Sequence, residues 1–408
     1  MVSIRILLAA GLFATVVAAA ADEEESFDEP PIDIPSENLV ELQFSADPYA
    51  DQDKLDMIKS GLANLAAIRY ESNSFASSNS KYTGVYGDFC VYDAHLNDVE
   101  PSLYPTVDEM IFTSEHCGEH TYTLPLDEVV AAVSDHDAQS GQTHPSVEGL
   151  LFHTGHSGAG LSANVLAAFD NTVVVPEHSA LHDALFACDQ IHSRFKSADC
   201  STSHQKQLVQ DVINLATRSS DASVTHAYIK FKAEDTVYLS MVREILPDTP
   251  WTFYYRDSDT TLAKSTQNKR NTCVMSRRQP SEDLVQKAED LNIDLESLST
   301  EDLCALQLST LLEAATQEHK SSGTGMLISY EQLLEPGFIA NVVLPYLGLQ
   351  VDPSTVSATV DSTLSIKSNN RGGIKQWKAD EEVIHISEKV SHASKLFMGD
   401  AMQALRRL

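Results

Sequence analysis

A glycine-rich turn at residues 150–166, LLFHTGHSGAGLSANVL, constrains the fold of this chain more than any other feature. An apolar run leads into the turn, and an apolar stretch with helical spacing follows it, which predicts a strand, a tight turn and a helix. Gly155, Gly158 and Gly160 allow close backbone approach, and Ser157 supplies a hydroxyl. The free N–H groups of a helix N-terminus bind anions, so the turn is a candidate anion site. An ordinary strand–helix turn is the alternative, because the Lys-Ser/Thr ending of a nucleotide triphosphate loop is absent.

The chain after residue 146 alternates between apolar runs and amphipathic stretches. This alternation predicts an α/β fold with a mostly parallel sheet and helices on both faces. The expected strands cover residues 150–153, 172–175, 225–231, 251–255 and 325–329. The expected helices cover residues 162–169, 205–218, 238–246 and 338–347, and a charged helical region at 281–322 should cap the sheet.

The N-terminal part divides into three segments. Residues 1–21 have the single positive charge, apolar core and small-residue end of a secretory signal peptide. Residues 22–37 hold eight acidic residues, no basic residue and three prolines, a composition typical of a disordered tail. Residues 38–145 form an accessory α+β region, followed by the main domain at 146–408. The signal peptide predicts a secretory-pathway protein, either in the Golgi lumen, at the cell surface or secreted, with no stable membrane span after cleavage.

Three short elements are expected in the accessory region. Residues 55–68 carry apolar side chains at helical spacing and predict a helix. Residues 84–92 and 110–113 read as strands, and residues 134–145 as a polar connector.

Six cysteines in an exported chain permit up to three disulfides. Cys188 and Cys200 are close enough to bridge a short loop, and pairs 90–117 and 273–304 would complete a set. Spacing alone does not determine the connectivity, and no pair has zinc-ligand spacing, so no metal is expected.

The net charge of −31 excludes several partner classes. Nucleic acid and anionic membranes are poor partners because like charges repel. An anionic cofactor would need cations gathered locally, whereas a cationic or neutral acceptor fits more easily.

Five segments stand out in order along the chain: residues 152–161; 173–178; 237–265; 326–336 with 346–349; and RGGIKQWK at 371–378. Together they resemble the sulfotransferase family, whose members are P-loop NTPase-like α/β proteins that use 3′-phosphoadenosine-5′-phosphosulfate (PAPS). Residues 152–161 are similar to the family's 5′-phosphosulfate loop. The resemblance is to a divergent member like those of unicellular eukaryotes, and it covers roughly residues 147–380.

The resemblance implies roles for the residues of the glycine-rich loop. The 5′-phosphosulfate would bind Gly155, Ser157, Gly158, Ala159, Gly160 and Leu161. His156 stands where the family has Lys or Arg, and as an imidazolium it would stabilise the bridging oxygen. Ala159 and Gly160 replace the two threonines of the family, which removes hydroxyl donors. A plain polar loop residue is the alternative role for His156.

Further roles follow from the later segments. Glu177 lies one residue from the place of the catalytic carboxylate in protein-tyrosine sulfotransferases, so it would be the general base or, alternatively, an ordinary helix cap. Arg256, with Lys264 or Ser265, would bind the 3′-phosphate; a salt bridge from Arg256 to Asp257 or Asp259 is the alternative. Arg371, Gly372 and Gly373 would close over the nucleotide, unless they form only a solvated basic loop.

The leading functional hypothesis is therefore transfer of a sulfuryl group from PAPS to a hydroxyl of a carbohydrate, protein or small molecule. A second hypothesis is a catalytically degenerate protein of the same fold that binds a nucleotide or a partner. A third is a secreted acidic matrix or ion-binding protein, although no regular calcium-loop spacing is present.

Overall fold

The structure, a computed structural model, describes residues 52–70, 84–91, 106–114, 117, 121–141, 144–189, 202–267, 272–278, 280–349, 356, 366–367, 375–376 and 384–408. The expected signal peptide, the acidic tail and the Arg371, Gly372 and Gly373 segment lie outside the described residues. The described residues all belong to one compact unit, Tyr49–Leu408.

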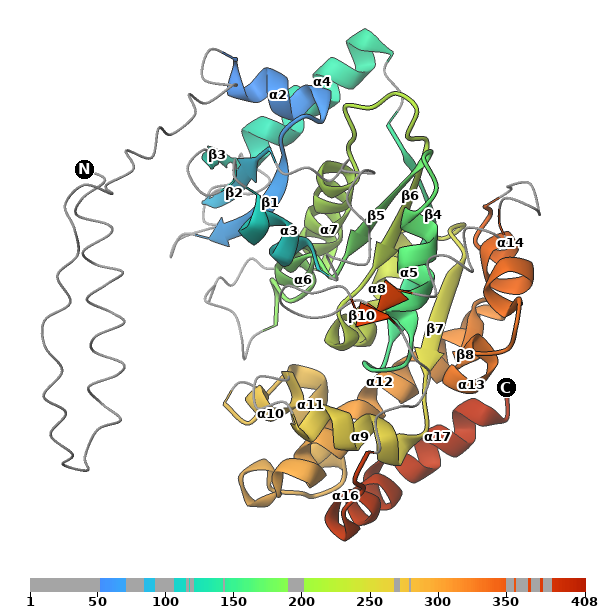
Figure 1. Cartoon of the computed structure of the whole chain (residues 1–408). Coiled ribbons are helices and arrows are strands. Elements are labelled where there is room, and N and C mark those ends of the chain that lie inside the picture. The colour runs from blue at the N-terminus through green and yellow to red at the C-terminus, as the bar shows by residue number, and fades with distance from the viewer. Residues whose placement is uncertain are drawn as a thin grey trace, which may run out of the picture. The chain divides into compact units, whose positions relative to one another are not determined.

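A five-stranded parallel sheet forms the centre of this unit (Figure 1). Its strands are β4 (Ser146–His153), β5 (Thr172–Pro176), β6 (His226–Lys230), β7 (Trp251–Tyr255) and β8 (Met326–Ser329). They lie in the order β5-β6-β4-β7-β8, and every neighbouring pair is parallel. The predicted α/β class and all five predicted strands of the main domain are confirmed.

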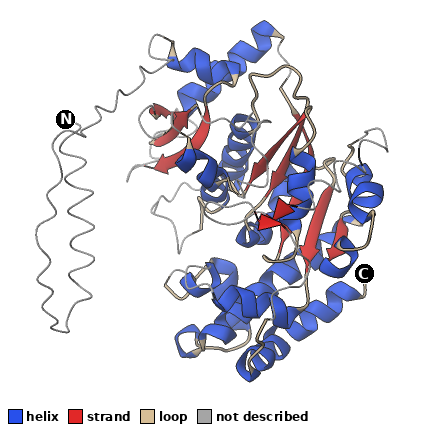
Figure 2. Ribbon diagram, viewed as in Figure 1, coloured by secondary structure: helices blue, strands red, loops and turns tan. Residues whose placement is uncertain are grey.

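Helices cover both faces of the sheet (Figure 2). The helices between and beside the strands are α5 (Ala159–Ala167), α6 (Ser179–Leu185), α7 (Thr202–Ala216), η3 (Ala233–Tyr238), α8 (Leu239–Ile245), α9 (Ser258–Gln267), α10 (Thr272–Met275), α11 (Glu282–Asp290), η4 (Leu295–Ser297) and α12 (Thr300–Ser322). The C-terminal part adds α13 (Tyr330–Leu333), η5 (Ile339–Val343), α14 (Leu344–Tyr346), α16 (Glu388–Ala393), η6 (Ser394–Met398), α17 (Gly399–Arg406) and the two-residue strands β9 (Ile366–Lys367) and β10 (Lys375–Gln376).

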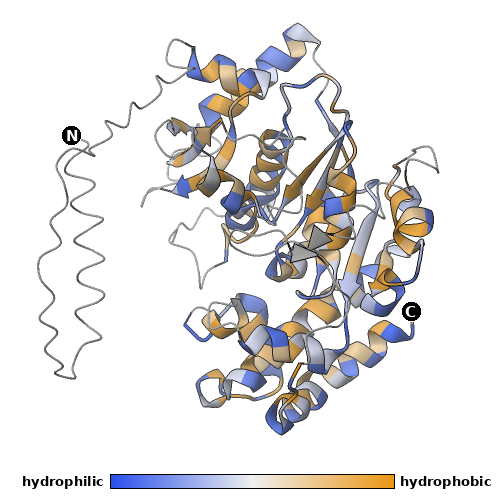
Figure 3. Ribbon diagram, in the orientation of Figure 1, coloured by the Kyte–Doolittle hydropathy of each residue, from blue (hydrophilic) through white to orange (hydrophobic). Residues whose placement is uncertain are grey.

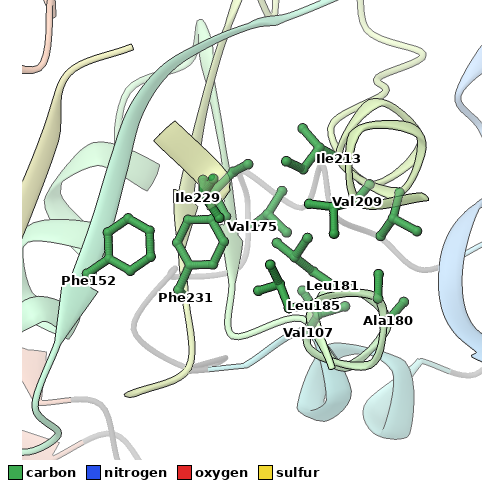
Figure 4. Packing of buried hydrophobic residues seen from close by; sticks show 14 of the residues in the cluster. Val107, Phe152, Val175, Ala180, Leu181, Leu185, Val209, Ile213, Ile229 and Phe231 are labelled. Carbon is green, nitrogen blue, oxygen red and sulfur yellow. The ribbon is translucent and has the colours of Figure 1, made fainter. Parts of the chain in front are cut away.

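Alternation along the strands sends neighbouring side chains to opposite faces. Leu150 and Phe152 of β4 enter one hydrophobic cluster with residues of α6, α7 and α12, whereas Leu151 enters a second cluster with residues of α5 and α14. Figure 3 shows hydrophobic residues gathered on the central strands and α5. In the first cluster the rings of Phe152 and Phe231 stack with centroids 4.3 Å apart (Figure 4). Hydrophobic side chains therefore cover both faces of the sheet.

The accessory region contains a separate antiparallel sheet in the order β1-β2-β3, with β1 at Asn64–Tyr70, β2 at Val85–Cys90 and β3 at Tyr122–Pro125. Helices α2 (Lys54–Ser60), α3 (Val107–Thr113) and α4 (Leu126–Ser140) accompany it. Its residues share a core with the main domain: Val107 of α3 packs among Ala180, Leu181 and Leu185 of α6 (Figure 4).

Three expectations for the accessory region are wrong. The helix expected at 55–68 ends at Ser60, because Gly61 adopts a left-handed conformation (φ 80°) and its N–H caps the last turn; β1 then begins at Asn64. Residues 110–113 belong to α3, because the Thr106 side chain caps the N–H of Glu109. The connector expected at 134–145 is helical as far as Ser140, while Gly141, His144 and Pro145 lie outside helices and strands.

Disulfides Cys90–Cys117 and Cys273–Cys304 confirm two of the expected pairings. Cys188 is also disulfide-bonded, and Cys200, its expected partner, lies outside the described residues. In the part of the chain that the structure describes, no helix is long and apolar enough to cross a membrane.

Candidate functional site

The carboxyl ends of four parallel strands bring the candidate residues to one edge of the central sheet. His153 at the end of β4 lies opposite Tyr254 of β7, and Pro176 at the end of β5 lies opposite Lys230 of β6. The segments that follow these strands therefore leave the sheet side by side. In open α/β sheets this edge is where ligands bind.

The glycine-rich loop after β4 forms the turn and helix start that the sequence predicts. Gly155 (φ 80°), His156 (φ 51°) and Gly158 (φ 88°) all have left-handed backbones. Gly158 is the N-cap of α5 and provides no side-chain cap for the first-turn N–H groups. A Cβ on Gly158 would lie 2.4 Å from Cδ2 of Leu333 and 3.2 Å from Cδ2 of Tyr330, so only glycine fits there.

The remaining loop residues line the start of α5. Ser157 is almost fully buried, and no hydrogen-bond partner for its Oγ occurs among the described residues. Ala159 and Leu161 are buried, whereas a Cβ built on Gly160 meets no atom within 4 Å. The turn thus combines one unsatisfied hydroxyl with open space at the helix N-terminus, which suits a small anionic group.

His156 is exposed at the surface of the loop, yet its environment opposes a positive charge. Loss of hydration beside the surrounding protein, followed by the charges of Lys264, His153 and Arg256, outweighs the attraction of Glu177 and lowers the pKa of His156 to about 4. The imidazole is therefore neutral near pH 7, and the free protein does not present the imidazolium that the family resemblance implies.

Glu177 follows β5 in a strained backbone conformation with φ 49°. Its N–H donates to the carbonyl oxygen of Lys230 at 2.6 Å, and its Oε1 accepts from the ammonium of the same lysine. Burial would raise the pKa of Glu177, but Lys230 and His153 overcome that effect and hold it well below its usual range. Glu177 is thus an ionised carboxylate and, while paired with Lys230, a weak base.

His153 and Lys230 are site residues that the sequence analysis missed. The Nδ1 of His153 accepts the N–H of Gly155 at 2.9 Å, so a neutral ring carries its proton on Nε2, which lies 3.4 Å from Oε1 of Glu177. Lys230 is only 6% exposed at the end of β6. A lysine that ends an otherwise apolar strand is the signal that would have identified it.

Arg256 directly follows β7, as expected, and its guanidinium lies over an aromatic ring. Its guanidinium carbon is 4.0 Å from the ring centroid of Tyr330, and its Nε is 3.7 Å from Oδ2 of Asp257. The alternative pairing with Asp257 is therefore present, while Asp259 instead accepts from Ser391. Cδ2 of the same Tyr330 ring would lie 3.2 Å from a Cβ on Gly158, so one ring borders both the loop and the arginine.

The two candidates on α9 differ in their surroundings. Lys264 is close enough to the loop for its charge to lower the pKa of His156, whereas Ser265 is 2% exposed. Of the pair, Lys264 contributes to the positive field at the loop. Residues 375–376 form β10, which pairs with β9, but the predicted nucleotide-closing residues at 371–373 lie outside the described residues.

The nearby histidines have structural roles. His178 accepts the N–H of Ala180 at Nδ1, and its Nε2 lies 2.9 Å from the carbonyl oxygen of Leu65 in β1. The Nδ1 of His182 lies 2.6 Å from Oδ1 of Asp235, which outweighs burial and raises the pKa of His182. Both imidazole rings already contact groups of the protein through their nitrogens, so they are poor candidates for the general base.

We expect acidification from pH 7 to 4.5 to destabilise the fold through His178. Burial lowers the pKa of His178 to about 4, so the unfolded chain (pKa about 6.5) binds a proton that the folded protein does not. The contribution of His178 is therefore complete above pH 6.5 and falls by roughly 3 kcal/mol as the pH approaches 4. Urea unfolding at stepped pH measures the summed slope. The lowered pKa values of His144 and His156 add to this slope, the raised pKa of His182 opposes it, and the lowered pKa of Glu177 adds to it only below pH about 4.5. His178→Asn, which can still cap α6, should show a smaller slope; equal slopes would contradict the assignment.

No family model matches the chain, and no curated protein matches it significantly.

Proposed function

We propose that this protein binds PAPS at the carboxyl edge of its central sheet and transfers the sulfuryl group to a hydroxyl-bearing acceptor. One observation carries the proposal: the charges of Lys264 and Arg256 reach His156 of the glycine-rich loop, and Lys230 lies at the end of a neighbouring strand paired with Glu177, in a chain of net charge −31. Cations gathered at a helix N-terminus against such a background suit a multiply charged anion.

A P-loop-like sulfotransferase architecture is part of this proposal. The strand that carries the loop, β4, is central in the order β5-β6-β4-β7-β8, between the strands that end in Lys230 and lead to Arg256. This order supports a ligand site at the carboxyl end of β4. The chain runs from β4 through α5 to β5 on one side of the sheet, and the later strands β7 and β8 lie on the other side of β4. Ligands bind where the connections diverge in this way.

The residues fit the two charged ends of the nucleotide. The N-terminus of α5, with Ser157 and the open position at Gly160, would hold the 5′-phosphosulfate. Arg256 and Lys264 would hold the 3′-phosphate, with Ser265 and the 371–373 segment as family-implied additions. The bound nucleotide supplies the activated sulfuryl group; the chain supplies position and charge.

Lys230 and Glu177 would act together on the acceptor. While the Lys230 ammonium pairs with Glu177, the carboxylate is a weak base. When Lys230 turns toward an anion, Glu177 loses its largest stabilising charge, its pKa rises, and it can accept the proton of an acceptor hydroxyl. His153 keeps the carboxylate oriented through its Nε2.

We place the protein in the secretory pathway. Two described disulfides and a third at Cys188 suit an oxidising compartment. A Golgi lumen, cell-surface or secreted location agrees with the leader expected at residues 1–21.

Calorimetric titration of the protein with 3′-phosphoadenosine-5′-phosphate tests the site. We expect micromolar binding that Arg256→Ala weakens by about 10- to 100-fold, the range for loss of a charged hydrogen bond. Arg277→Ala is the matched control, because Arg277 is exposed and bonds only carbonyl oxygens of Glu296 and Leu298 among the described residues. Absence of binding at millimolar nucleotide would overturn the proposal.

Binding without turnover is the second candidate function. The neutral state of His156 and the absence of hydroxyls at Ala159 and Gly160 favour it, because one lost donor costs about 10²–10³ in rate. Consumption of PAPS in the presence of a panel of hydroxyl acceptors separates the two: nucleotide binding without any product would support the second candidate.

A further inference from the structure

Helices α4 and α7 border a groove of about 900 Å³ that is separate from the candidate site. It includes His144 and Pro145, which immediately precede the amino end of β4. The glycine-rich loop follows the carboxyl end of the same strand, on the order of 20 Å away. A ligand in the groove would therefore occupy the opposite edge of the sheet from the proposed nucleotide.

The lining of the groove is mostly negatively charged. Five carboxylates line it against one guanidinium: Asp127, Glu128, Asp135, Asp137 and Asp211 against Arg218. That guanidinium is already used, because its two terminal nitrogens each lie 2.9 Å from an oxygen of Asp137. His144 adds no charge near pH 7, since burial and Arg218 lower its pKa. The remaining surface is anionic and repels anions.

The groove also has an apolar component. Val133 and Leu215 are buried side chains that line it, and Val130, Ala131 and Pro145 extend this lining. A lining that holds both carboxylates and apolar side chains suits a ligand that carries both characters. A small, purely hydrophilic cation would leave the apolar part unused.

The groove has the length and the walls of a site for a short helix. Gln207, Asp211, Asn214 and Leu215 line it along one face of α7, and Thr217 and Arg218 follow in the turn after that helix. From Gln207 to Leu215 this face is about 12 Å long at 1.5 Å per residue, the length of some eight residues of helix. An amphipathic helix set between two helices is a common mode of peptide recognition.

We propose that this groove binds a basic amphipathic helix of a partner protein. The Lys and Arg side chains of that helix would pair with Asp127, Glu128 and Asp135, and its apolar face would cover Val130 and Ala131. The inference does not depend on the proposed nucleotide site.

Fluorescence anisotropy of the full chain with a labelled twelve-residue peptide tests the groove. The probe carries Lys and Leu at helical spacing, and a scrambled peptide of identical composition is the comparison. We expect micromolar affinity for the amphipathic probe, about tenfold weaker affinity for the scrambled one, and partial weakening by salt. Equal affinities, or no binding, would overturn the proposal.

Variants separate the groove from the general negative charge of the protein. The triple variant D127N/E128Q/D135N should weaken binding about tenfold, whereas E289Q/E296Q/E335Q, which removes three exposed charges elsewhere, should change it less than about twofold. Ala131→Phe fills the groove without a charge change and should also weaken binding about tenfold. Circular dichroism confirms that each variant is folded. Equal losses in the two triple variants would mean non-specific attraction and would reject the site.

Discussion

Replacing Lys230 by methionine is expected to lower the free energy of unfolding by about 3 kcal/mol. The ammonium of Lys230 is buried and pairs with Glu177, whose pKa it holds well below the usual range. Removal of the lysine leaves a largely buried carboxylate without its main countercharge, which is the costly way to break such a pair. Chemical denaturation at pH 7 measures the loss.

The double variant K230M/E177Q is the control for this prediction. It removes both charges together, so it should recover at least about half of the stability lost in the single variant. A single variant within about 0.5 kcal/mol of the unaltered protein would show that the pair contributes little net energy. In that case Glu177 would already have its ordinary basicity, and the proposed control by Lys230 would be wrong.

Gly158→Ala is expected to destabilise the protein by about 2–3 kcal/mol and to abolish detectable nucleotide binding. Gly158 has φ 88°, a conformation that costs an L-residue about 1–2 kcal/mol. The added Cβ would also lie 2.4 Å from Leu333 and press on Tyr330, the ring against which Arg256 lies. Thermal denaturation and titration with 3′-phosphoadenosine-5′-phosphate measure the two effects.

Gly160→Ala is the matched control, two residues away in the same helix. Its backbone is ordinary and a Cβ there meets no atom within 4 Å, so the substitution should stabilise α5 by about 0.5–1 kcal/mol. Equal stability changes in the two variants would contradict the assigned geometry of the loop.

The main sheet could be predicted because its strands are buried on both faces and read as apolar runs. The strand–turn–helix at residues 150–166 could be predicted equally well, since three glycines between two apolar stretches are typical of a tight turn. The accessory region was harder. Residues 55–68 have one continuous apolar pattern, but a left-handed Gly61 divides it into the helix α2 and the strand β1.

The candidate site was only partly predictable, because its electrostatics depend on strand order. Sequence placed Glu177 and Arg256 after strands, yet gave no sign that Pro176 would lie opposite Lys230. This strand register brings the ammonium of Lys230 to the carboxylate of Glu177, which is therefore part of an ion pair and not a free base. The lowered pKa of His156 likewise results from burial by the folded chain and then from the charge of Lys264, which is distant in sequence.

The bond between His178 and Leu65 has a consequence for how such a protein can evolve. His178 immediately follows the strained residue Glu177, and its Nε2 lies 2.9 Å from a carbonyl oxygen of β1. The helix that begins after His178, α6, also packs its buried side chains against Val107 of α3. Any recombination that exchanged the segment before residue 145 for a foreign one would therefore also have to rebuild the support of Glu177. The accessory region and the carboxyl edge of the sheet should for this reason be inherited together.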